Sequence, residues 1–130
     1  DAQLTMAQKV PLSGAVIVST PQDIALLDAR KGIEMFRKMD VPVLGMIENM
    51  STYICSACGH EEHIFGHNGA KNEAKKLGIE FLGGIPLEAS IRLNSDQGTP
   101  IIAQDPESET AKSFRAIAKT VKDSIFSEAE

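Results

Sequence analysis

Two short segments, residues 14–20 and 41–50, are apolar at nearly every position rather than at every second position. A strand with this pattern is buried on both faces, as strands are in parallel sheets that carry helices on both sides. After the first segment, Thr20-Pro21-Gln22-Asp23 predicts the start of a helix, with the Thr20 hydroxyl as its N-cap. The sequence therefore predicts an α/β fold in which a mostly parallel sheet is flanked by helices.

The rest of the chain continues this alternation. We expect a third strand at residues 79–85, helices at residues 1–8, 69–77 and 88–95, a short extended piece at residues 99–102, and a last helix capped by Asp105-Pro106. Asp1 is expected to cap the first helix. Strands buried on both faces need neighbours, and three strands make a thin sheet. Residues 1–130 are therefore interpreted as the C-terminal portion of a larger domain.

Charge and cysteine content narrow the class of protein. A net charge of −5 without a basic patch argues against a nucleic acid or an anionic membrane surface as partner. There is no run of 18 apolar residues, so no membrane-spanning helix is expected. The chain has 2 cysteines, too few and too close together for a disulfide scaffold. A reducing compartment is therefore expected.

Both cysteines lie in residues 51–67, which break the alternation and are interpreted as an inserted metal-binding loop. The Cys55-x2-Cys58 spacing places two thiolates on one turn, where they can hold one tetrahedral metal ion or one edge of a cluster. Gly59 permits the tight turn that points backbone N–H groups at the sulfur atoms. Structural zinc and most clusters take four ligands, so two thiolates alone do not complete such a site.

Three completions of the cysteine site remain open. In the first, a symmetric dimer brings two Cys-x2-Cys loops together. In the second, His60, His63 or His67 joins the cysteines within one chain, although the spacing is shorter than in a zinc finger. In the third, the loop binds no metal and is a reduced or oxidised dithiol.

A nucleotide site is suggested by the polar residues that follow the expected strands. Ligands of open α/β sheets bind beyond the carboxyl ends of the strands. Asn49 ends the second strand, and its amide can both donate to and accept from an adenine edge. Pro86 and Leu87 end the third strand and can pack on the base. From the pattern alone, however, a turn-forming role for Asn49 and a capping role for Asp23 are favoured.

The phosphate side of such a site is absent from the sequence. There is neither a G-x-x-x-x-G-K-[ST] loop nor a G-x-G-x-x-G motif. Without the loop and its lysine, nothing in these 130 residues holds a triphosphate and magnesium. This polypeptide by itself is therefore not expected to be an ATPase.

The motifs occur in an order that resembles one known family. Residues 14–23 (Gly-Ala-Val-Ile-Val-Ser-Thr-Pro-Gln-Asp), residues 41–51 (Val-Pro-Val-Leu-Gly-Met-Ile-Glu-Asn-Met-Ser), Cys55-x2-Cys58-Gly-His, Ile85-Pro-Leu and residues 95–101 (Ser-Asp-x-Gly-x-Pro-Ile) follow one another along nearly the whole chain. Together they resemble the Mrp/ApbC/Nbp family of iron–sulfur carrier ATPases, including its mitochondrial Ind-type members.

The resemblance implies a deviant Walker A ATPase fold of the MinD/ParA group and a homodimer that holds a bridging [4Fe–4S] cluster. It implies that ATP binding or hydrolysis in the full-length protein gates delivery of the cluster to apo iron–sulfur proteins. By position, Cys55 and Cys58 match the cluster ligands, Asn49 matches the adenine-contacting residue, and Pro86 and Leu87 match the segment beside the base. A cytoplasmic location is expected, with the mitochondrial matrix as the alternative.

Two departures from the family pattern bear on function. Ser56 stands where many members carry proline after the first cysteine, and the phosphate loop, switch region and Walker B strand are expected before Asp1. Two other functions stay open. One is a zinc- or metal-bridged dimerisation module without nucleotide function, and the other is an Mrp-type ATPase whose cysteines are regulatory.

Overall fold

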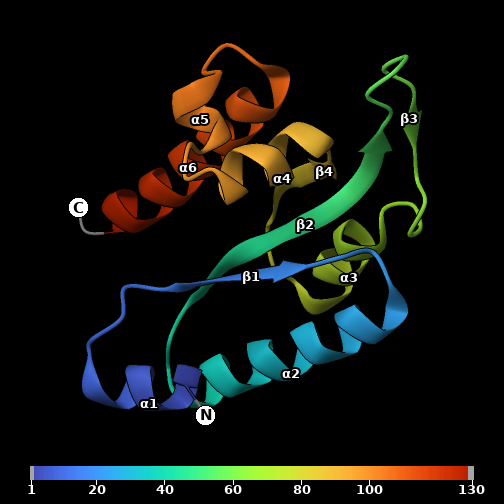
Figure 1. Ribbon diagram of the computed structural model, residues 1–130. Helices are drawn as coiled ribbons and strands as arrows, with labels where there is room; N and C mark the ends of the chain where they lie inside the picture. Colours follow the sequence, from blue (N-terminus) through green and yellow to red (C-terminus); the bar gives the residue numbers. More distant parts are fainter. Residues whose placement is uncertain (1, 129–130) are drawn as a thin grey trace.

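Strand β2, Val43–Ile54, runs through the middle of the sheet, and the other strands pair along its two edges. The computed structural model describes residues 2–128 (Figure 1). Its other elements are α1 Ala2–Lys9, β1 Ala15–Ser19, α2 Asp23–Lys38, β3 Glu61–Glu62, α3 Gly69–Leu77, β4 Phe81–Leu87, α4 Ala89–Asp96, α5 Ile101–Gln104 and α6 Glu109–Glu128. No helix within these residues is long and apolar enough to cross a membrane.

The sheet is mostly parallel, as predicted. β1 and β4 both run parallel to β2, and Met46 of β2 pairs with Ile17 on one edge and with Phe81 on the other. The short strand β3 is antiparallel to the far end of β2. Because Tyr53 pairs with Glu62 of β3 and also with Leu87 of β4, β3 lies on the edge of β2 opposite β4.

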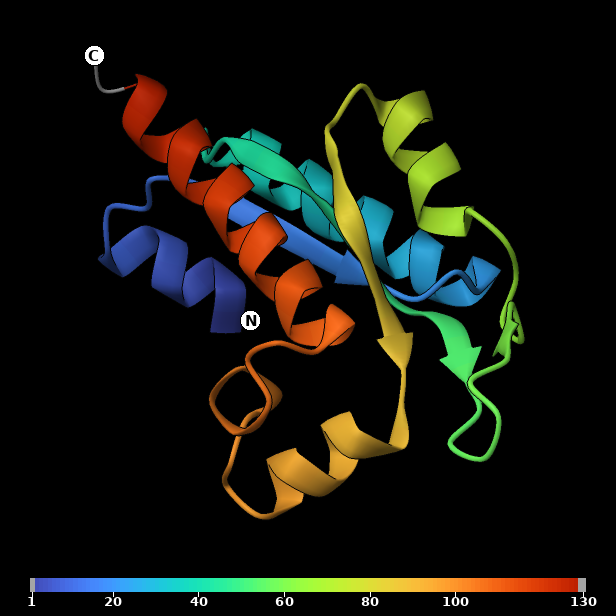
Figure 2. The ribbon, with the colours of Figure 1, turned by 90° about the horizontal axis from the view of Figure 1, so that it is seen from above.

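Helices cover both faces of this sheet. On one face, α2 and α3 enclose the main core, which consists of Ile17, Leu26, Ala29, Ile33, Met46, Ala70 and Ala74. On the other face, α6 packs against β4, where the Ile117 side chain lies over Gly83. Figure 2 shows α6 across the sheet from α2. Because β1, β2 and β4 run parallel, their carboxyl ends point to the same edge of the sheet.

The predicted boundary of the second strand is wrong at its C-terminal end. It was expected to end at Met50, but β2 continues through Ser51, Thr52, Tyr53 and Ile54. These residues do not form an apolar run, so the sequence resembles a loop. They are extended because partners from β3 and β4 are available on both edges.

Three further local predictions are wrong, at the starts of α2, α5 and α6. Helix α2 begins at Asp23 after an extended Gln22, and the Thr20 hydroxyl donates to the Gln22 side-chain oxygen at 3.0 Å rather than capping the helix. The predicted extended piece at residues 99–102 is wrong from Ile101 onward, because α5 begins there and the Ile101 side chain is buried. The expected cap at Asp1 lies outside the described residues.

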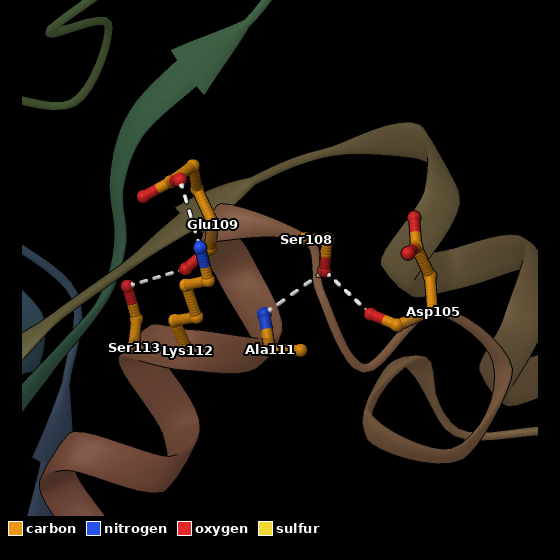
Figure 3. A network of polar contacts seen from close by, with 6 residues as sticks. All are labelled: Asp105, Ser108, Glu109, Ala111, Lys112 and Ser113. Carbon is orange, nitrogen blue, oxygen red and sulfur yellow. Dashed lines mark hydrogen bonds and ion pairs between the residues drawn. The ribbon is translucent and has the colours of Figure 1, made fainter.

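The third wrong prediction concerns the start of α6 (Figure 3). Ser108, not Asp105-Pro106, caps this helix, since its hydroxyl accepts a hydrogen bond from the Ala111 N–H at 3.1 Å. The same hydroxyl donates to the Asp105 carbonyl at 2.9 Å. A serine that precedes the first helical residue satisfies an N–H group that the helix itself leaves without a partner.

Candidate functional site

The two cysteines lie in the loop of a β-hairpin formed by β2 and β3. Cys55 follows the last residue of β2, and its N–H donates to the His60 carbonyl at 3.0 Å. The Gly59 N–H donates to the Cys55 carbonyl at 2.8 Å, and Gly59 adopts a φ of 75°. This confirms the predicted tight turn at Gly59, since glycine adopts a positive φ without steric cost. Both thiols are free, with Cys55 half-buried and Cys58 exposed.

Backbone N–H groups of the turn act on the pKa of Cys55. Hydrogen bonds from the backbone N–H of Ala57, then from that of Cys58, and then from the Cys58 side chain lower the pKa of Cys55 below its ordinary value. Partial desolvation and the negative charge of Glu62 act in the opposite direction. Hydrogen bonds to a sulfur stabilise its charged form, and the thiolate is the form that binds metals.

We therefore expect Cys55 of the folded, metal-free protein to be alkylated with a pH midpoint below that of Cys55 in the urea-unfolded chain. A lowered pKa leaves the thiolate present to lower pH, and the reaction slows as the pH falls through that pKa. Ala57→Pro removes the N–H with the largest effect and should raise the midpoint, whereas Ser56→Ala should not. Iodoacetamide labelling, with tandem mass spectrometry to separate Cys55 from Cys58, measures this. Equal midpoints in the folded and unfolded chains would contradict it.

The structure does not bring the histidines to the cysteines. The His60 Nε2 lies 3.5 Å from Glu62 Oε1, and the rings of His63 and His67 contact each other with centroids 4.1 Å apart. Within residues 2–128, no three His, Cys, Asp or Glu side chains are grouped so as to hold a metal ion. A histidine-completed site within one chain, one of the three predicted completions, is therefore not supported.

Asn49, Pro86 and Leu87 do come together. They line one cavity of about 560 Å³ beside the middle of β2 and the carboxyl end of β4, with walls that are mostly apolar. The cavity is completed by Val18, Ile47, Met50, Ile85, Glu88, Ile91, Arg92, Phe114 and Ile117. Its volume is in the range of small-ligand pockets, and a few polar groups among apolar walls are typical of such pockets.

Asn49 does not form the turn that its pattern favoured. It lies within β2 and pairs with Ile85 of the parallel strand β4. Asp23 occupies the first position of α2 and lines a different cavity, together with Phe65 and His67. The Asp23 side chain makes no hydrogen bond that would confirm the favoured capping role. Asp23 does not line the Asn49 cavity.

One buried acid at this edge was not singled out from the sequence. Glu48 is buried, and its Oε2 accepts a hydrogen bond from the Ala70 N–H at 2.8 Å, in the first turn of α3. The residue in the N-cap position, Asn68, has a φ of 55° and makes no capping hydrogen bond with its side chain. Glu48 therefore serves as the cap from the neighbouring strand. The only signal in the sequence is an acid within an otherwise apolar run.

Comparisons with known proteins find a family model and relatives that match nearly the whole chain. Residues 1–122 match the ParA family model described as NUBPL iron-transfer P-loop NTPase. The chain is 54% identical over 121 residues to the iron-sulfur cluster transfer protein NUBPL of Dictyostelium discoideum, covering 93% of the chain and 38% of that protein. It is 52% identical over 130 residues to the iron-sulfur cluster carrier protein of Escherichia coli K12, covering 100% of the chain and 35% of that protein.

Solved structures share the fold. A nucleotide-binding protein from Archaeoglobus fulgidus in complex with ADP superposes with a TM-score of 0.69 at 36% identity, over 84% of the chain and 44% of that protein. The cell division ATPase MinD of Pyrococcus furiosus, at 22% identity and a TM-score of 0.65, shares the fold over 85% of the chain and 43% of its own. The chain thus spans less than half the length of these relatives. It belongs to the ParA-type family of NUBPL iron-transfer P-loop NTPases.

Proposed function

We propose that this chain is part of an iron–sulfur cluster carrier, in which Cys55 and Cys58 hold the cluster as cargo for transfer to apo iron–sulfur proteins. The observation that carries the proposal is a hairpin loop with two free thiols, one of them exposed, that has no third ligand group within residues 2–128. Relatives at 54% and 52% identity bear the names of cluster transfer and carrier proteins. A reducing compartment, cytoplasm or mitochondrial matrix, suits free thiols of this kind.

The remaining ligands are proposed to come from a second copy of the chain. Two hairpins facing each other across a two-fold axis supply four thiolates, which is the ligand set of a [4Fe–4S] cluster. Each protomer then contributes two ligands, so cluster affinity and dimerisation are thermodynamically linked, and removal of iron should shift dimer to monomer.

The Asn49 cavity is proposed to hold the adenine of ATP in the longer protein. The amide of Asn49 matches the donor and acceptor pattern of the base edge, and Pro86 and Leu87 offer apolar surface to its face. The similar nucleotide-binding protein from Archaeoglobus fulgidus was solved with ADP, which supports this assignment. The sequence has no phosphate loop, so this chain is proposed to supply only the base side of the site.

Anaerobic reconstitution with iron and sulfide tests the proposal, with metal content and oligomeric state measured on the same sample. We expect a dimer with about two iron and two sulfide per protomer and absorption at about 400 nm. The Cys55→Ser/Cys58→Ser variant should lose the iron and become monomeric, because it lacks the sulfur ligands. His60→Ala is the matched control and should keep both.

Other outcomes of this reconstitution identify the competing functions. A colourless dimer with about half an equivalent of zinc per protomer would favour a metal-bridged dimerisation module instead. A metal-free protein that transfers no cluster would favour regulatory cysteines. Iron loss in the His60→Ala variant equal to that of the double cysteine variant would refute the all-cysteine ligand set.

A further inference from the structure

The pairing of β2 with β4 shifts register between the Asn49 cavity and the cysteine hairpin. Asn49 pairs with Ile85 and Tyr53 pairs with Leu87, so residues 50–52 of β2 face Pro86 alone on β4. Such an excess of residues on one strand is a β-bulge, which bends the strand and changes its direction. The regular parallel part of β2 therefore ends at the cavity, and the part beyond the bulge leads into Cys55.

The neighbouring residues explain why the bulge forms here. The Ile85 carbonyl faces β2, so the nitrogen of the next residue, Pro86, faces the other edge of β4, where no N–H is needed. The Ser51 hydroxyl of the bulge donates to the Ile85 carbonyl at 3.5 Å. Gly84 leaves room for this side chain, since a Cβ at Gly84 would lie 2.8 Å from Ser51 Oγ. The bulge is thus built by side chains from both strands.

Met50 is the strained residue of the bulge. Its φ is 52°, in the left-handed region that residues with a side chain rarely adopt. Met50 also lines the cavity, together with Asn49 and Pro86. The same residue is therefore a wall of the cavity and the point where β2 turns toward the cysteines.

We infer that Met50 couples occupation of the Asn49 cavity to the position of Cys55 in the hairpin. This inference rests on the proposed function and adds the residue through which a nucleobase regulates the cysteine site. A base packed in the cavity favours one conformation of Met50 and so restricts the hairpin. By linkage, a hairpin held by its cargo must in return favour the same conformation of the cavity and raise affinity for the base.

Amide hydrogen exchange of the hairpin, measured by NMR on the chain itself, tests the coupling with adenosine as the probe. The reporters are the N–H groups of Cys55 and Gly59, whose hydrogen bonds close the hairpin. Adenosine should slow their exchange about fivefold to tenfold, as expected of a typical coupling between two sites. The Met46 amide, which donates to the Glu80 carbonyl at 2.9 Å and lies outside the cavity lining, serves as the internal reference for global stability.

Met50→Gly is the test variant, because glycine adopts both signs of φ and loosens the joint. Its adenosine affinity is measured by titration, and at saturating adenosine the exchange of the two hairpin amides should respond less than about twofold. Asp40→Gly is the matched control: Asp40 has a φ of 58° at the end of α2, so the same kind of strain is relieved away from the hairpin. This control should keep the full wild-type response.

The outcomes separate this inference from the proposed function. If adenosine binds and the hairpin amides of the wild-type chain do not respond, or if Met50→Gly responds as fully as Asp40→Gly, the coupling is refuted. If titration shows no adenosine binding, the proposed base site fails, and the ligand-free comparison decides the coupling. In that case Met50→Gly should still speed exchange of the Cys55 and Gly59 amides relative to Met46, and unchanged exchange would overturn the inference.

Discussion

Gly69→Ala is expected to lower the free energy of unfolding by about 2–3 kcal/mol, at the high end of what overpacking costs. A Cβ on Gly69 would lie 2.5 Å from the Pro21 carbonyl oxygen and 2.9 Å from its Cα. Both are backbone atoms, so no change of rotamer relieves the overlap. Either α3 or the segment between β1 and α2 has to move, and α3 is also held by the buried carboxylate of Glu48.

Urea unfolding of Gly69→Ala beside Gly32→Ala measures this effect. Gly32 lies inside α2, where the nearest atom to an added Cβ is the Ile17 Cδ1 at 3.8 Å. Alanine there should raise the free energy of unfolding by about 0.5–1 kcal/mol, because it lowers the entropy of the unfolded chain and favours the helix. The same substitution should thus have opposite signs at the two sites. A Gly69→Ala chain as stable as the wild type would mean that α3 does not contact Pro21 as described.

Arg30→Ala is expected to lower the free energy of unfolding by about 2 kcal/mol, because it leaves the carboxylate of Glu73 without its partner. Glu73 is 5% exposed, and its Oε1 accepts a hydrogen bond from Arg30 Nε at 2.7 Å and a second bond from the same guanidinium. The pair joins α2 to α3. The Arg30 side chain is 43% exposed, so water partly compensates the loss, and the effect should stay below that of a fully buried pair.

The Arg30→Leu/Glu73→Leu double variant should be within about 1 kcal/mol of the wild type, since replacing both partners removes the unpaired charge. Arg30→Lys, which keeps the charge but loses the paired N–H donors, should fall between the wild type and Arg30→Ala. Chemical unfolding of all four chains gives the comparison. A double variant less stable than Arg30→Ala would show that the ion pair itself, rather than the cost of an unpaired carboxylate, stabilises the contact between α2 and α3.

Much of the fold and of the candidate site could be predicted because the relevant signals are local. Apolar runs identified β1 and most of β2, and helical spacing identified α2, α3 and α6. The carboxyl ends of parallel strands meet at one edge, so Asn49 and Pro86 were expected near each other, and they line one cavity. The turn at Gly59 was expected because a positive φ favours glycine.

Some errors occurred where a residue has its partner far away in the chain, and others where one side chain can satisfy either of two nearby groups. The polar segment after Met50 resembles a loop, and it is a strand only because β3 and β4 return to pair with it. Thr20 matched the pattern of a helix cap, yet its hydroxyl bonds to Gln22 and α2 begins later. A hydroxyl that can satisfy either a neighbouring side chain or a helix N–H is not assigned by its sequence position.

The sequence by itself determined the alternation of strands and helices, the pair Cys55 and Cys58, and the glycine turn beside them, since each depends on residues within a few positions of one another. Only the tertiary structure decided that Glu48 caps α3, that Pro21 lies against Gly69, and that the bulge at Met50 faces Pro86. These contacts join segments that are distant in the chain. Their geometry follows from strand register and helix packing, which are set by burial across the whole sheet and leave no local pattern.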